Sequence, residues 1–116
     1  MRSHQRSKVL RRLWPVVGLG VMGLAQAADE SVEAAGKPRF MESCAVCHGT
    51  DAASGGVLPD LRRASPETHA TWDAIVRGGL YRERGMPAFA QIFSAEDSEA
   101  VRAFVLERAW QAYESQ

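Results

Sequence analysis

The two cysteines of this chain constrain its fold more than any other feature. They are the only cysteines in 116 residues, and they lie in Cys44-Ala45-Val46-Cys47-His48. A C-x-x-C-H run is the attachment signal for c-type haem. Its two thiols add across the two vinyl groups of one porphyrin, and the following histidine offers a neutral imidazole to the iron. The motif therefore predicts one covalent haem c, held by Cys44 and Cys47 and ligated by His48.

Other uses of a cysteine pair fit this chain less well. A structural disulfide is the default for two cysteines in an oxidising compartment, but their close spacing disfavours it. A thioredoxin-type pair follows a strand, and no alternating apolar pattern precedes Cys44. A structural zinc site needs a second pair of ligands, and His69 supplies only one. We therefore prefer the haem interpretation over these three alternatives.

The first 27 residues have the pattern of a secretory signal. A basic start is followed by an apolar run over residues 13–25 and by Ala25-Gln26-Ala27, which a signal peptidase accepts. The sequence predicts a signal peptide over residues 1–27 and a single exported, periplasmic domain over residues 28–116. A retained membrane anchor is disfavoured because the run is shorter than the roughly 20 residues of a spanning helix. Arg11-Arg12 also leaves a twin-arginine signal open.

Removal of the signal changes the charge of the protein. The whole chain has 14 basic and 14 acidic residues. Five of the basic residues and none of the acidic ones lie in residues 1–27, so the remaining domain has a net charge of −5. Such an acidic body makes nucleic acid an unsuitable partner. A domain of about 90 residues also has a small core and often needs a cofactor to complete it.

The second axial ligand of the iron can be sought among four methionines. Met1 and Met22 fall in the predicted signal, and Met41 lies on the same helix as the attachment motif. Met86 remains, in a Gly-Met-Pro turn that presents its sulfur. Methionine opposite histidine is typical of cytochromes with raised potentials. The alternatives are that Met86 only fills the core, or that His69 is the second ligand.

Helical patterns predict an all-α fold of about three to five helices, with long loops wrapped around one covalent haem. We expect a first helix over residues 34–43, with its regular part starting near Pro38. A second helix should begin at Ser65-Pro66 and continue to Gly78. Ser94 and Asp97 resemble a capping box at the start of the last helix.

Several segments together resemble class I cytochromes c. The matching residues are Gly36, Phe40, Cys44 to Gly49, Pro59-Asp60-Leu61, Gly85-Met86-Pro87 and Phe104. The resemblance implies that the first and last helices cross at Gly36, Phe40 and Phe104. It also implies that the Pro59 carbonyl accepts a hydrogen bond from Nδ1 of His48, which would fix the tautomer of the ligand.

Residues 55–63, 75–80 and 83–89 are similar to the C-terminal cytochrome domain of quinohaemoprotein alcohol dehydrogenases. This resemblance implies an electron carrier that works beside a quinoprotein dehydrogenase. Its redox partners would be that dehydrogenase and a terminal oxidase or another cytochrome of the respiratory chain.

Polar donors near the haem can be proposed from their chemistry. Arg62 and Arg63 could bind the haem propionates through their forks of donors, and Trp72 could do so through its indole N–H. Three further arginines, at positions 77, 82 and 84, surround the methionine loop. They could form a positive rim for a redox partner, or a merely solvated face.

With His48 and Met86 both on iron, no position is open to oxygen or peroxide, which favours a one-electron carrier over an enzyme. Two alternatives stay open. The chain could be a haem subunit held permanently in a dehydrogenase or oxidase complex. It could also be a small haem enzyme whose sixth position is open.

Overall fold

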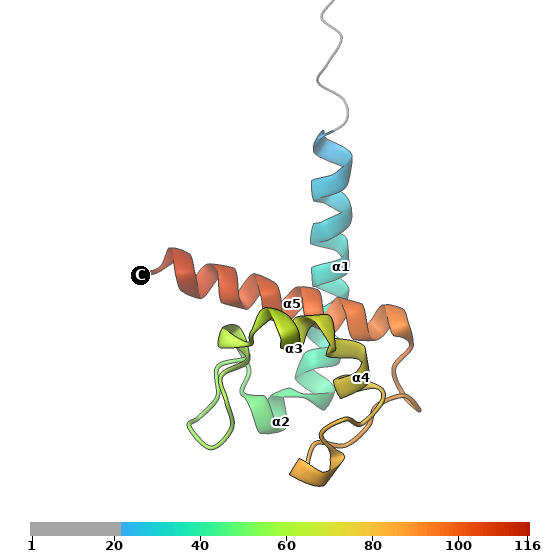
Figure 1. The fold of residues 1–116 in the computed structure, drawn as a ribbon. Helices are drawn as coiled ribbons and strands as arrows, with labels where there is room; N and C mark the ends of the chain where they lie inside the picture. Colours follow the sequence, from blue (N-terminus) through green and yellow to red (C-terminus); the bar gives the residue numbers. More distant parts are fainter. Residues whose placement is uncertain (1–21) are drawn as a thin grey trace, which may run out of the picture.

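A computed structural model describes residues 22–116, and the regular elements in that range are all helical (Figure 1). The predicted all-α class is confirmed. The elements in chain order are α1 (Met22–Ser43), α2 (Ala45–His48), the 3₁₀ helix η1 (Leu61–Arg63), α3 (Pro66–Ala70), α4 (Trp72–Val76), the 3₁₀ helix η2 (Arg82–Arg84) and α5 (Ala95–Glu114). No helix in the described range is long and apolar enough to span a membrane.

The two long helices, α1 and α5, cross and form the packed part of the core (Figure 1). A Cβ on Gly36 would stand 1.8 Å from the carbonyl oxygen of Ala100, so only glycine lets the backbones approach this closely. The rings of Phe40 and Phe104 pack beside this point, with centroids 5.0 Å apart. Both phenylalanines are buried. The contact expected from the resemblance is therefore present.

The start of the first helix differs from the prediction. α1 begins at Met22 and continues through Pro38, which we had expected to mark its regular start. Proline cannot donate to the carbonyl four residues earlier, which is that of Ala34. Both residues are exposed, so water can satisfy this carbonyl and the helix continues. The predicted cleavage after Ala27 falls within α1 and stays a prediction, and residues 1–21 lie outside the described range.

The predicted second helix is divided into α3 and α4 at Thr71. Ser65 caps α3 as expected, because its Oγ accepts from the backbone N–H of Thr68 at 3.2 Å. The hydroxyl of Thr71 donates to the carbonyl oxygen of Glu67 at 2.9 Å, a bond that bends helices. The break redirects the chain so that Trp72, Ile75 and Val76 are buried.

The start of α5 confirms the capping box. Asp97 N–H donates to Ser94 Oγ at 3.1 Å, and Asp97 Oδ2 accepts from Ser94 N–H at 3.0 Å. Asp97 also forms an ion pair with Arg39 of α1. The cap therefore fixes the start of α5 and ties it to the crossing helix.

Candidate cofactor site

A cavity of about 370 Å³ lies between the attachment motif and the methionine loop. Its walls come from the end of α1, from α2, from the segment through η1 to α4, and from the loop around η2. Six predicted site residues line it: Cys44, His48, Pro59, Arg63, Trp72 and Met86. The structure therefore brings together residues separated by up to 42 positions in the sequence.

The attachment motif forms one turn of helix, as the spacing predicted. The backbone N–H groups of Cys47 and His48 both donate to the carbonyl oxygen of Cys44, at 3.1 and 2.9 Å. Cys44 is buried and lines the cavity, whereas Cys47 is exposed, and both are free thiols. Burial is the main cause that raises the pKa of Cys44 to about 11, and the neighbouring Cys47 contributes less. Two free thiols one turn apart, one of them on the cavity wall, fit the thioether attachment of a haem.

His48 is the last residue of α2 and is half-buried at the cavity wall. Burial lowers its pKa and so favours the neutral imidazole that a metal ion requires. Its Nδ1 is buried and has no hydrogen-bond partner. The hydrogen bond expected from Nδ1 of His48 to the Pro59 carbonyl is therefore not formed, although Pro59 lines the same cavity.

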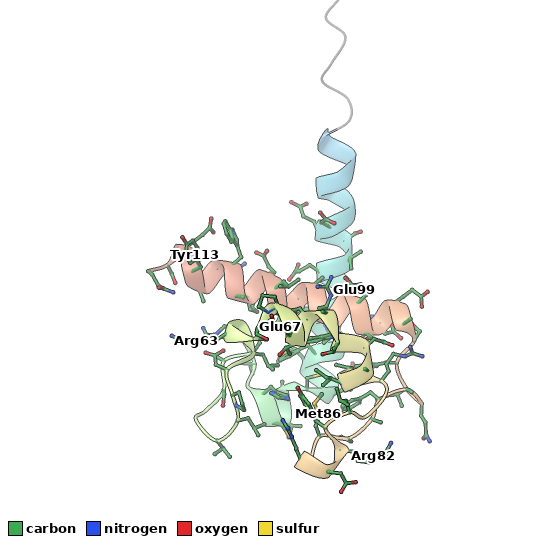
Figure 2. All side chains as sticks on the ribbon, in the orientation of Figure 1. Arg63, Glu67, Arg82, Met86, Glu99 and Tyr113 are labelled. Carbon is green, nitrogen blue, oxygen red and sulfur yellow. The ribbon has the colours of Figure 1, made fainter. Side chains whose placement is uncertain are left out.

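Met86 reaches the cavity because its loop turns sharply after η2. Gly85 has a φ of 93°, a left-handed conformation that glycine adopts without strain. The N–H of Met86 then donates to the Tyr81 carbonyl at 3.2 Å, and that of Phe89 donates to the Val76 carbonyl at 2.8 Å. Met86 is half-buried and packs against the core (Figure 2). Rigid turns on both sides thus aim its thioether inward.

Trp72 contributes its ring to the cavity but not its N–H. The indole nitrogen donates to the Ser98 carbonyl of α5 at 3.0 Å. The contact of this N–H with a haem propionate is not supported by this arrangement and stays a prediction. Trp72 joins α4 to α5 and presents an apolar face to the cavity.

Arg62 also has another role than the predicted one. It makes a two-point contact with Asp60, with Nε–Oδ1 and Nη2–Oδ2 distances of 3.0 and 2.7 Å. Hydrogen bonding to Arg62 lowers the pKa of Asp60. Arg62 lines a different groove from the cavity, so the structure does not place it with Arg63.

Arg77 is likewise fixed within the fold and does not form part of a free positive rim. Its Nε donates to the Phe93 carbonyl at 3.1 Å, and its Nη1 pairs with Asp73 at 3.1 Å. Of the three arginines near the methionine loop, only Arg82 and Arg84 lack an acidic partner in the described range.

His69 lies on the other side of Trp72 from the cavity. The two rings stack with centroids 5.6 Å apart, and His69 lines a separate groove of about 840 Å³. Burial is the main cause that lowers the pKa of His69, and the positive charge of the nearby Arg102 contributes less. This position favours Met86 over His69 as the residue that faces His48.

Two residues at the cavity were missed in the sequence. Tyr81 and Arg84 both line it, and the Arg84 guanidinium lies 4.7 Å from the centre of the Tyr81 ring. The only sequence signal for a role at the cavity was their position in the chain, five and two residues before Met86. A loop pattern does not show which of its side chains turn inward, so only the folded geometry identifies them.

Comparison with known proteins identifies the fold and its cofactor. Residues 31–105 match the family described as cytochrome c oxidase, cbb3-type, subunit III. The chain belongs to this family of cytochrome c domains. Its cofactor is haem c, bound covalently, and its role is electron transfer. The residues around the cavity, with a thiol, an imidazole and a thioether on mainly apolar walls, fit that group.

Individual relatives confirm the closer resemblance. The chain is 38% identical over 87 residues to quinohaemoprotein alcohol dehydrogenase ADH IIB of Pseudomonas putida. It is 39% identical over 85 residues to ADH-IIG of the same species. These alignments cover 75% and 73% of this chain but only 12% of each relative.

A solved structure shows the same relationship in three dimensions. The quinohaemoprotein alcohol dehydrogenase ADHIIG from Pseudomonas putida HK5 superposes with a TM-score of 0.69 and 37% identity. The match covers 74% of this chain and 12% of that chain. The cytochrome fold is thus shared with part of a much longer protein.

Proposed function

We propose that this chain is a periplasmic one-electron carrier. It holds one haem c through Cys44 and Cys47, with His48 and Met86 as axial ligands. It accepts electrons from a quinoprotein dehydrogenase, such as an alcohol dehydrogenase, and passes them to a terminal oxidase or another cytochrome of the respiratory chain. The observation that carries the proposal is that His48 and Met86 line one cavity, next to Cys44.

The haem supplies a reversible one-electron change at its iron. His48 and Met86 would hold the iron through a neutral imidazole and a thioether and would leave no position for oxygen or peroxide, which favours a carrier over an enzyme. The buried side chains Phe40, Trp72 and Val101 exclude water from the cavity. A thioether ligand and an apolar surrounding both favour the ferrous state, so the reduction potential is positive.

Export and partnership are supported by sequence relationships. The signal pattern over residues 1–27 favours transport out of the cytoplasm. The relatives are named as quinohaemoprotein alcohol dehydrogenases, in which the matched cytochrome part belongs to the same polypeptide as the rest of the protein. A carrier with this ancestry is suited to take electrons from a quinoprotein.

Optical spectroscopy of the purified protein tests the ligand assignment. The wild type should show haem c bands and the weak far-red band of a sulfur–iron bond. Met86→Ala should lose the far-red band and bind carbon monoxide when reduced. Met41→Ala is the matched control, because Met41 is exposed on α1 and lies outside the cavity. A far-red band that persists in Met86→Ala would overturn the assignment.

A second candidate is a haem subunit that stays within a dehydrogenase complex. It is favoured by the relatives, since 12% of their length corresponds to this domain. Gel filtration of a periplasmic extract with haem staining separates the candidates. A free carrier elutes at the size of the single domain, whereas a subunit elutes with the dehydrogenase activity.

A further inference from the structure

Two arginines face the cavity without an acidic partner. Arg63 comes from η1 and Arg84 from η2, and both line the cavity. Neither forms an ion pair in the described range, although Arg39, Arg62, Arg77, Arg102 and Arg108 each do. The one carboxylate on the cavity wall, that of Asp60, is bound by Arg62. The cavity wall therefore has two arginines that form no ion pair, and its one carboxylate is already bound by Arg62 and interacts more weakly with Arg63.

Arg84 is held in place by Tyr81. The guanidinium lies over the ring of Tyr81, 4.7 Å from its centre, and both residues line the cavity. The backbone N–H of Arg84 also donates to the Tyr81 carbonyl at 2.9 Å. A guanidinium above an aromatic face is stabilised electrostatically and loses part of its rotational freedom. Its donors are thus oriented before any ligand binds.

Arg82 differs from Arg84 although only two positions separate them. Both side chains are exposed, but only Arg84 lines the cavity and lies over an aromatic ring, that of Tyr81. Arg63, labelled in Figure 2, is the last residue of η1 and lies in a different part of the chain from Arg84. Lining the cavity is therefore specific to Arg63 and Arg84 and is not shared by every arginine near the methionine loop.

We propose that Arg63 and Arg84 bind the two propionate groups of the haem, with Tyr81 as the positioning residue for Arg84. This inference rests on the proposed haem site. A haem has two carboxylates and an otherwise apolar body, which matches an apolar cavity with two unpaired cations. The planar fork of arginine binds a carboxylate at two points, and charge-assisted bonds of this kind are strong.

The arginine pair, Arg63 and Arg84, also affects the iron. Propionate carboxylates stabilise the ferric state because it has one more positive charge than the ferrous state. Arginines that neutralise these carboxylates shift the equilibrium back toward the ferrous state. The pair therefore contributes both to the orientation of the cofactor and to a higher reduction potential.

Single substitutions of the arginine pair test the proposal. Covalent haem content is measured first, in the wild type and in each variant, by haem staining after denaturing electrophoresis. In Arg84→Gln and Arg63→Gln, we expect changed propionate bending bands in resonance Raman spectra. We also expect about a fivefold shift of the ferric–ferrous equilibrium toward the ferric state at low salt, for one screened charge near the haem. Arg82→Gln is the control and should change neither.

Further variants distinguish a specific arginine–propionate contact from a general effect of charge and from misfolding. Arg84→Lys should retain most of the potential but change the propionate bands, because it keeps the charge and loses the fork. Tyr81→Phe should resemble the wild type, whereas Tyr81→Leu should resemble Arg84→Gln in part. Unchanged propionate bands in both arginine variants, with haem attached, would overturn the arginine pair. Absence of covalent haem from the wild type would instead overturn the proposed function.

Discussion

The helix crossing and the cavity wall are built in different ways. At the crossing of α1 and α5, Gly36, Phe40 and Phe104 fit together without a cofactor. At the cavity, α2, η1, α4 and the methionine loop surround about 370 Å³ of space and leave Nδ1 of His48 unpaired. The comparison teaches that side-chain packing alone completes one half of the core. We propose that the haem completes the other half.

The largest predicted effect concerns the cavity half. The double variant Cys44→Ser/Cys47→Ser lacks both thiols, so haem staining after denaturing electrophoresis should be lost completely. Without the cofactor, amide hydrogen exchange should rise in α2, η1 and the loop around Met86 and change much less in α5. If amide hydrogen exchange rose equally in α5, the helix crossing and the cavity wall would unfold together and not independently.

The crossing should be sensitive to a single added side chain. Gly36→Val places carbon atoms against the Ala100 carbonyl, where even a Cβ would stand 1.8 Å away. Such overpacking should lower the free energy of unfolding by about 3 kcal/mol, measured by denaturant titration of the haem-bound protein. Gly55→Ala is the control, because a Cβ there meets no atom within 4 Å. A Gly36→Val protein as stable as this control would contradict the close approach of the helices.

A smaller effect is expected at the cap of α5. Ser94→Ala removes the oxygen that accepts the N–H of Asp97, so the free energy of unfolding should fall by about 1 kcal/mol. Ser54→Ala, in the loop between α2 and η1, is a matched serine control that caps no helix. The same denaturant titration measures both, and equal losses would argue against the capping box.

The smallest effect is a pH dependence at His69, which lies outside the cavity. Burial lowers its folded-state pKa, so below its ordinary value of about 6.5 the unfolded chain takes up the proton first. Stability should therefore be fully present above that pH and fall as the solution becomes more acidic. His69→Gln should reduce the loss between pH 7.5 and pH 5, measured as a shift in the denaturant midpoint. An identical loss in both proteins would remove His69 as the cause.

Sequence patterns predicted the helices best where a local signal exists. Ser65 and Ser94 cap helices as expected, because capping depends on side chains within three residues of the cap. The first helix was predicted over residues 34–43 with its regular part starting near Pro38, but α1 begins at Met22 and includes Pro38, because proline disfavours a helix interior without always ending the helix. The break at Thr71 was missed because it depends on one hydroxyl bond and on the burial of Trp72.

The residues of the candidate site also differ in how far a local sequence signal predicts them. The attachment motif and Met86 could be found from spacing and elimination, and the structure places Cys44, His48 and Met86 at one cavity. The proposed propionate donors were predicted only in part, because the sequence indicated Arg63 but not Arg84. Arg62 and Arg63 are neighbours in the sequence, but one is bound to Asp60 and the other faces the cavity.

The sequence by itself determined the cofactor chemistry, because two thiols and an imidazole within five residues fix it through local helical geometry. It also determined the all-α class through capping and periodicity. Only the tertiary structure decided which polar groups face the cavity, because donors such as Trp72 and Arg62 bind other partners that folding brings near. The direction of a side chain depends on these competing partners, which the spacing of residues along the chain does not reveal.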